Sequence, residues 1–178
     1  MVILVIGGSG SGKSEYAENR CMQLEENQKL YIATMEAYDE ESRARVARHR
    51  RQRMGKGFDT LECYTHLEDA EIPEGKTVLL ECVSNLTANE MFSRQGRKED
   101  TADVILAGIK RLVREAGRVI IVTNQAFSDG IAYSPETERY LRMLAWVNSS
   151  IARLADEVVE VVHGIPVFLK RKSAEERE

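Results

Sequence analysis

The fold is decided by the stretch Gly7-Gly8-Ser9-Gly10-Ser11-Gly12-Lys13-Ser14, which fits the pattern G-x-x-x-x-G-K-[ST]. The apolar run Val2–Ile6 precedes it and is typical of a buried strand. The residues from Lys13 to Glu26 follow with the composition of a helix. A strand, a glycine-rich loop and a helix in this order predict a phosphate-binding P-loop.

The residues of this loop suit a bound phosphate group. Glycines let the backbone curl so that successive N–H groups point inward, and the helix N-terminus adds partial positive charge. Lys13 is expected to reach the β- and γ-phosphates of a nucleoside triphosphate, and Ser14 to hold Mg²⁺. The alternative is a glycine-rich turn that binds no ligand.

Length and composition exclude several classes of protein. A chain of 178 residues, 43% of them hydrophobic, predicts one domain spanning residues 1–178. A net charge of −4 argues against a nucleic-acid binder. The three cysteines are far apart, which fits neither a disulfide framework nor a zinc site and suits the reducing cytoplasm. No segment approaches the roughly 20 apolar residues of a membrane span.

Apolar runs alternate with stretches of helical character, which predicts an α/β fold: a P-loop NTPase-type, mainly parallel sheet flanked by helices. The turn at Gly164 indicates an antiparallel edge strand at the C-terminus. The expected strands are Val2–Ile6, Leu30–Ala33, Val78–Cys82, Val119–Thr123, Val158–Val162 and Ile165–Lys170. The expected helices are Lys13–Glu26, Glu36–Arg53, Ser84–Phe92, Ala102–Glu115, capped by Thr101, and Pro135–Ala155, opened by Ser134. Residues 54–73 give no clear pattern.

Polar residues end several of the expected strands. In an open parallel sheet, ligands bind beyond the carboxyl ends of the strands, where Thr34, Glu81 and Asn124 fall with the P-loop. Glu81 stands where P-loop proteins place an acidic partner for Mg²⁺. The alternative for Glu81 is a solvated carboxylate. The long segment from Asn124 to Tyr133 is interpreted equally well as a substrate-binding loop or as a cover for the sheet.

A basic cluster stands out in this acidic chain. Residues 43–53 contain six arginines and His49, and Arg45, His49 and Arg53 fall on one helix face. A solvated basic helix is one interpretation. The other is a nucleophilic imidazole among anion-binding guanidinium groups, which would take a nucleotidyl or phosphoryl group. His66 and His163 lack such company and are interpreted as structural or solvated.

Taken together, the chain resembles the bifunctional adenosylcobinamide kinase / adenosylcobinamide-phosphate guanylyltransferase family through most of its length. The ordered motifs that carry the resemblance are the P-loop, Tyr31-Ile32-Ala33-Thr34, Arg45–Arg50, Thr60-Leu61-Glu62, Leu79-Leu80-Glu81-Cys82, Ser84-Asn85-Leu86, Val122-Thr123-Asn124, Asn148, Ala155–Val158 and Val162–Lys170.

The resemblance implies two reactions of corrinoid assembly. Adenosylcobinamide would be phosphorylated with ATP or GTP, and GMP would then pass from GTP through His49 to that phosphate, giving adenosylcobinamide-GDP. It implies a homotrimer, with Mg²⁺ held by Ser14 and Glu81, and Lys13 and His49 as catalytic residues. The implied nucleotide-binding residues are Gly7, Gly8, Ser9, Gly10, Ser11, Gly12, Lys13, Ser14, Ala33, Thr34, Met35, Arg50, Arg51, Gln52, Arg53, Glu62 and Glu81.

The chain departs from the family pattern at two places. Gly10 replaces an arginine of the P-loop, and residues 124–133 replace the family's N-E-V-G-x-G-[IV]-V-P, with Gln125 in place of the acid. The kinase reaction is the one that these departures are expected to affect. Two other functions would fit a P-loop: a kinase for a nucleoside or small metabolite, which needs no histidine, and a GTP-binding regulator, which forms no covalent adduct.

Overall fold

The computed structural model describes residues 1–24, 29–125 and 133–172. Its strands are β1 (Val2–Gly7), β2 (Lys29–Ala33), β3 (Phe58–Glu62), β4 (Thr77–Glu81), β5 (Arg118–Asn124), β6 (Glu157–Val162) and β7 (Ile165–Arg171). Its α-helices are α1 (Lys13–Gln23), α2 (Glu40–Arg53), α3 (Val83–Phe92), α4 (Thr101–Glu115) and α5 (Pro135–Leu154). Two short 3-10 helices, η1 (Leu67–Asp69) and η2 (Lys98–Asp100), precede β4 and α4.

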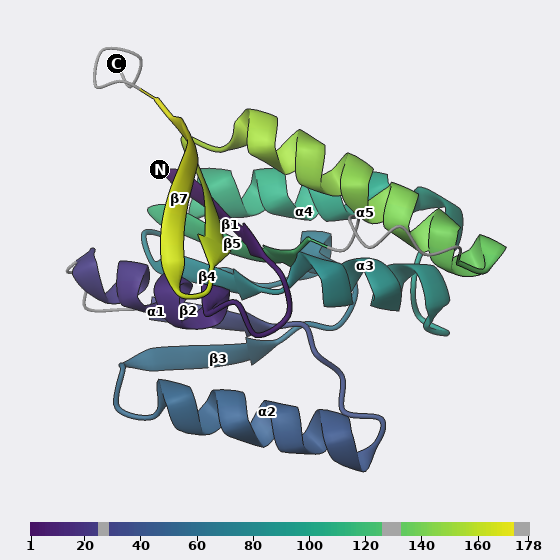
Figure 1. Cartoon of the computed structure of the whole chain (residues 1–178), viewed down its shortest axis with the longest axis horizontal. Helices are drawn as coiled ribbons and strands as arrows, with labels where there is room; N and C mark the ends of the chain where they lie inside the picture. The colour runs from purple at the N-terminus through teal and green to yellow at the C-terminus, as the bar shows by residue number, and fades with distance from the viewer. Residues whose placement is uncertain (25–28, 126–132, 173–178) are drawn as a thin grey trace.

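The strands form one sheet in the order β3-β2-β4-β5-β1-β6-β7. Every neighbouring pair is parallel except β6 and β7, which form an antiparallel hairpin. Figure 1 shows α3, α4 and α5 on one face of the sheet and α1 on the other, while α2 runs beside the edge strand β3. The predicted P-loop NTPase-type α/β fold with an antiparallel C-terminal edge is therefore confirmed.

The central strands bury both of their faces, which explains their nearly continuous apolar sequence. In β1, Val2 and Leu4 belong to the core beneath α3, α4 and α5, whereas Ile3 and Val5 pack on the side of α1. This double layer fixes the carboxyl ends of β1, β2, β4 and β5 side by side, with Ala33 opposite Glu81 and Gly7 opposite Asn124.

Several predicted boundaries are wrong, and each has a local cause. Helix α2 starts at Glu40, not Glu36, because Asp39 and Ser42 form a reciprocal capping box. Thr101 is the first residue of α4 rather than its cap, and its hydroxyl donates to the Lys98 carbonyl. Ser134 caps α5 as predicted by accepting from the Thr137 N–H. Strand β3 lies in the stretch for which the sequence predicted no element.

Candidate active site

The P-loop joins β1 to α1 through backbone conformations that favour glycine. Gly10 and Gly12 have φ of 72° and 89°, in the left-handed region. The tip of the β6–β7 hairpin supports the loop, because the Gly164 N–H donates to the Ser11 carbonyl at 2.8 Å. A side chain at Gly7 would bring its Cβ to 2.7 Å from the Val161 carbonyl oxygen. The P-loop therefore lies in close contact with the end of β6 and with the β6–β7 turn.

Lys13 lies across this loop rather than in solvent. Its side chain is buried, and its ammonium group donates to the Gly8 carbonyl at 2.9 Å. Burial lowers the pKa of Lys13, because desolvation penalises the charged form more than the nearby Cys82 and Glu81 favour it. The Lys13 ammonium group, which is predicted to bind phosphate, is therefore held at the P-loop. It has more N–H donors than its contact with the Gly8 carbonyl uses.

Ser14 and Glu81 meet behind the loop. The Ser14 hydroxyl donates to Oε1 of Glu81, which ends β4. The second carboxylate oxygen of Glu81 is shielded from solvent and has no hydrogen-bond partner among the described residues. Hydroxyl and carboxylate oxygens are the donors that Mg²⁺ prefers, so this pair fits the cation that the sequence implies.

Thr34 is brought to the same edge but is fully buried. Its hydroxyl accepts from the Cys82 N–H at 2.7 Å and donates to the Cys82 carbonyl at 2.8 Å. It therefore fixes the end of β4, next to Glu81. Asn124 also reaches this edge, where its amide donates to the Ser84 hydroxyl at 2.8 Å.

Helix α2 brings His49 to a pocket that it shares with the last residues of β2, β3 and β4. His49 lines a small pocket of about 50 Å³, and its Nδ1 is shielded from solvent without a hydrogen-bond partner among the described residues. The pocket contains many of the predicted residues: Ala33, Met35, His49, Arg50, Arg53, Glu62 and Glu81. Glu81 therefore touches both halves of the site, the P-loop through Ser14 and the His49 pocket directly.

Two arginines after His49 are held by specific partners. The guanidinium group of Arg50 pairs with Glu62 on β3. That of Arg53 lies over the ring of Tyr31 with 3.5 Å between its Cζ and the ring centroid, and its side chain is buried. The other two predicted residues of this run, Arg51 and Gln52, are exposed and do not line the pocket.

The His49 pocket opens toward larger hollows. A volume of about 50 Å³ is far below the roughly 300–1,000 Å³ of a typical ligand site, so a nucleotide would extend beyond it. A neighbouring groove of about 690 Å³ shares Arg50, Arg53, Thr60 and Glu62 with it. This arginine-lined groove suits anionic phosphates.

Sequence reasoning missed some residues of the pocket. In the sequence, Tyr31 is part of an apolar run that is typical of a strand, yet the guanidinium group of Arg53 stacks on its ring. Burial together with the Glu81 carboxylate raises the pKa of Tyr31. Tyr64 lies in the region without a clear pattern; its hydroxyl donates to Glu62 at 2.8 Å, and burial followed by that contact raises its pKa to about 12.

The remaining histidines lie outside this site. The ring Nε2 of His66 lies 2.8 Å from the Gln95 carbonyl oxygen, and the backbone N–H of His66 donates to the carboxylate of the buried Glu90. Although His66, Glu68 and Glu90 lie close enough to share a cation, their contacts tie the η1 region to the loop after α3. His163 occupies the hairpin turn with φ of 49°. Most of the predicted substrate loop, residues 126–132, lies outside the described residues.

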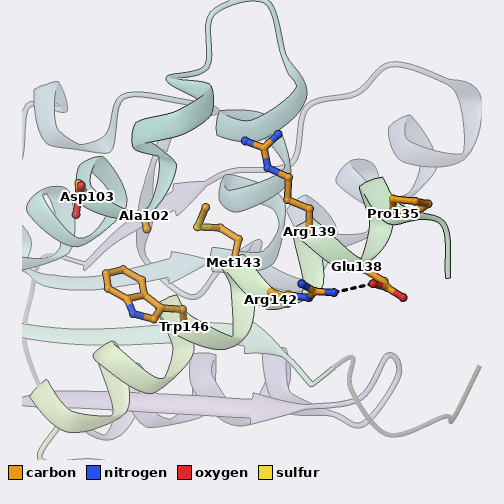
Figure 2. Close-up of a pocket in the computed structure, with 8 residues that line it drawn as sticks. All are labelled: Ala102, Asp103, Pro135, Glu138, Arg139, Arg142, Met143 and Trp146. Atoms are coloured by element: carbon orange, nitrogen blue, oxygen red, sulfur yellow. Dashed lines mark hydrogen bonds and ion pairs between the residues drawn. The ribbon is translucent and has the colours of Figure 1, made fainter. Parts of the chain in front are cut away.

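A separate hollow, of about 640 Å³, lies on the α4–α5 side (Figure 2). Its lining includes the half-exposed Trp146, with Met143, Arg139 and Arg142, and none of the predicted site residues. In the part of the chain that the structure describes, no helix has the length and apolar character to cross a membrane.

Comparisons with known proteins show which family this chain belongs to. Residues 3–169 match the family described as cobinamide kinase / cobinamide phosphate guanyltransferase. The chain is 37% identical to the bifunctional adenosylcobalamin biosynthesis protein CobU of Escherichia coli K12, over 96% of this chain and 100% of that protein. It is 33% identical to the CobU protein of Salmonella typhimurium LT2, with the same coverage.

A curated relative of lower identity and a solved structure are also similar to this chain. The bifunctional adenosylcobalamin biosynthesis protein CobP of Pseudomonas aeruginosa is 29% identical over 94% of this chain and 96% of its own length. Among solved structures, the flagellar accessory protein FlaH of Methanocaldococcus jannaschii has a TM-score of 0.54 at 12% identity, covering 96% of this chain and 78% of FlaH. At that identity the likeness concerns the fold alone.

Proposed function

The chain belongs to the cobinamide kinase / cobinamide phosphate guanyltransferase family, and we propose that it performs both reactions on adenosylcobinamide. It phosphorylates the corrinoid with ATP or GTP, then transfers GMP from GTP to that phosphate to give adenosylcobinamide-GDP. The observation that carries this proposal is the position of Glu81, which joins the P-loop to the pocket of a histidine lined with arginines.

The kinase reaction uses the P-loop half of the site. The corrinoid hydroxyl attacks the γ-phosphorus, the bond to the β-phosphate oxygen breaks, and the hydroxyl proton is released. Lys13 and the loop N–H groups bind the phosphates and neutralise the charge that moves to the leaving group. Ser14 and Glu81 would hold Mg²⁺, which would supply further charge neutralisation.

The transfer reaction uses the α2 half. A neutral ring nitrogen of His49 attacks the α-phosphorus of GTP, forming a P–N bond as the P–O bond to pyrophosphate breaks. An oxygen of adenosylcobinamide phosphate then attacks the same phosphorus, and the P–N bond breaks. Arg50 and Arg53, which share the pocket and its neighbouring groove, would bind the phosphate oxygens of the nucleotide.

We also propose that the protein is a homotrimer in the cytoplasm. The support for assembly is β7, an outer strand of the sheet that exposes Ile165, Val167, Phe168 and Leu169 by 40–66%. An exposed apolar edge strand is a pairing hazard unless another chain covers it. The support for the cytoplasm is that Cys21, Cys63 and Cys82 are free thiols.

Product analysis tests the proposed function. Incubated with adenosylcobinamide, ATP, GTP and Mg²⁺, the protein is expected to yield adenosylcobinamide phosphate and adenosylcobinamide-GDP, separable by chromatography. The His49→Ala variant is expected to stop at the phosphate. A simple kinase would give the same products in the wild type and in His49→Ala. A GTP-binding regulator would form neither product. Each of these results would contradict the proposal.

A further inference from the structure

We propose that the corrin ring of the acceptor binds in a hollow beside the His49 pocket, here named the tyrosine groove. It has a volume of about 600 Å³, and its lining includes Glu36, Tyr38, Tyr64, Asn89, Phe92 and Arg94. This inference rests on the proposed function, since that function names a corrinoid as the acceptor. It deepens that function by assigning the acceptor a place of its own.

The walls of the tyrosine groove are fixed to one another. Asn89, buried on α3, donates through its Nδ2 to the Thr34 carbonyl and to the Tyr64 carbonyl, at 2.9 Å each. One amide thus joins α3 to the segment after β2, which carries Glu36 and Tyr38, and to the segment after β3. A site built in this way is preorganised, which lowers the cost of binding.

The tyrosine groove adjoins the proposed nucleophile's pocket. Tyr64 lines both hollows. Its hydroxyl donates to Glu62, and Glu62 pairs in turn with Arg50, the neighbour of His49. A hollow lined by Met35, Glu36 and Asn85 makes a second connection between them. An acceptor bound in the groove could therefore extend its phosphate arm toward His49.

The lining of the groove fits a flat, amide-rimmed macrocycle better than a nucleotide. Tyr38 and Phe92 are 66% and 46% exposed and offer flat apolar faces. Gln95 and Ser93 add amide and hydroxyl groups, and Glu36 and Arg94 bring opposite charges to the same lining. A corrinoid is a flat macrocycle rimmed with amide side chains, which need both donors and acceptors. The arginine-lined groove on the other side presents Arg50 and Arg53, as nucleotide phosphates require.

Direct binding tests the assignment. Equilibrium dialysis with adenosylcobinamide phosphate, followed by its visible absorbance, would compare the wild type with Tyr38→Ala and Phe92→Ala. Loss of one aromatic face is expected to weaken binding about tenfold. Trp146→Ala is the matched control, because Trp146 is 50% exposed in the α4–α5 hollow, and it should bind like the wild type.

The outcomes separate the inference from the function beneath it. Unchanged binding in Tyr38→Ala and Phe92→Ala, no binding by the wild type, or weakening in Trp146→Ala would overturn the inference. So would a loss of GTP affinity in Tyr38→Ala with corrinoid affinity intact, since the groove would then hold the guanine base. Corrinoid binding that follows the expected pattern in a protein that never transfers GMP would contradict the proposed function and leave the inference standing.

Discussion

Lys13 holds a positive charge in a buried position, so we expect it to serve nucleotide binding at some expense to the stability of the fold. Replacing it with methionine removes the bond to the Gly8 carbonyl but also the buried charge. Because a typical hydrogen bond contributes about 1 kcal/mol, we expect Lys13→Met to change the free energy of unfolding by no more than about that. Thermal stabilisation by GTP, measured by differential scanning fluorimetry, should nevertheless disappear.

The same residue predicts a pH dependence. Burial lowers the pKa of Lys13 below 10.5, so between the lowered pKa and 10.5 the unfolded chain binds more protons than the folded one. The contribution of Lys13 to unfolding free energy therefore rises with pH through that window. Urea titrations across alkaline pH should show that rise in the wild type and a smaller one in Lys13→Met. Identical slopes in the two proteins would contradict the burial argument.

Glu81 is expected to act through its charge. The Glu81→Gln variant keeps an acceptor for the Ser14 hydroxyl but loses the negative charge beside it. We expect the Mg²⁺ concentration for half-maximal turnover to rise by about 10- to 100-fold. The matched control is Glu74→Gln, on an exposed turn before β4. An unchanged Mg²⁺ requirement would exclude Glu81 from the cation site.

The sequence predicted the charged residues of the candidate site but not the contacts that hold them in place. The spacing of glycines and Lys13 indicated the P-loop, and charge alone singled out His49. The burial of Thr34 against Cys82 and the stacking of Arg53 on Tyr31 depend on strand register, which no local pattern encodes. Arg51 and Gln52 stand beside the pocket residues in sequence but lie on the exposed side of α2.

At the scale of elements, the turn after α2 is anchored by one buried contact. The ammonium group of Lys56 pairs with Glu18 on α1, whose side chain is 2% exposed. Lys56→Met would leave that carboxylate without its cation and should cost about 3 kcal/mol of unfolding free energy in urea titrations. Lys76→Met, which breaks a pair with the 71% exposed Asp59, should cost less than about 1 kcal/mol. Equal losses of unfolding free energy in Lys56→Met and Lys76→Met would contradict the expected effect of burying Glu18.

The elements that the sequence missed or misplaced share a physical cause. Strand β3 is an edge strand whose Asp59, Thr60 and Glu62 face solvent, so it lacks the apolar run that marked the central strands. The start of α2 was placed four residues early because Glu36 and Ala37, which favour helices, precede the capping box at Asp39. Strands buried on both faces were predicted correctly, since burial on both faces requires a nearly continuous run of apolar residues.

At the scale of the whole molecule, the outer strand β7 predicts assembly. Val167 lies within its exposed apolar surface, so Val167→Lys should convert the proposed trimer to monomers without unfolding it. Analytical ultracentrifugation would measure the mass. The control is Met22→Lys, a comparably exposed residue on α1. A monomeric wild type, or a trimer that survives Val167→Lys, would refute assembly through β7.

We propose above that His49 carries GMP on a covalent bond. The most direct test is the intact mass of the protein after incubation with GTP and Mg²⁺ at neutral to basic pH, beside the His49→Ala variant. We expect a gain of one GMP mass that acid removes and that the variant lacks. A protein that binds GTP without gaining that mass, or a variant that still gains it, would show that His49 does not carry GMP.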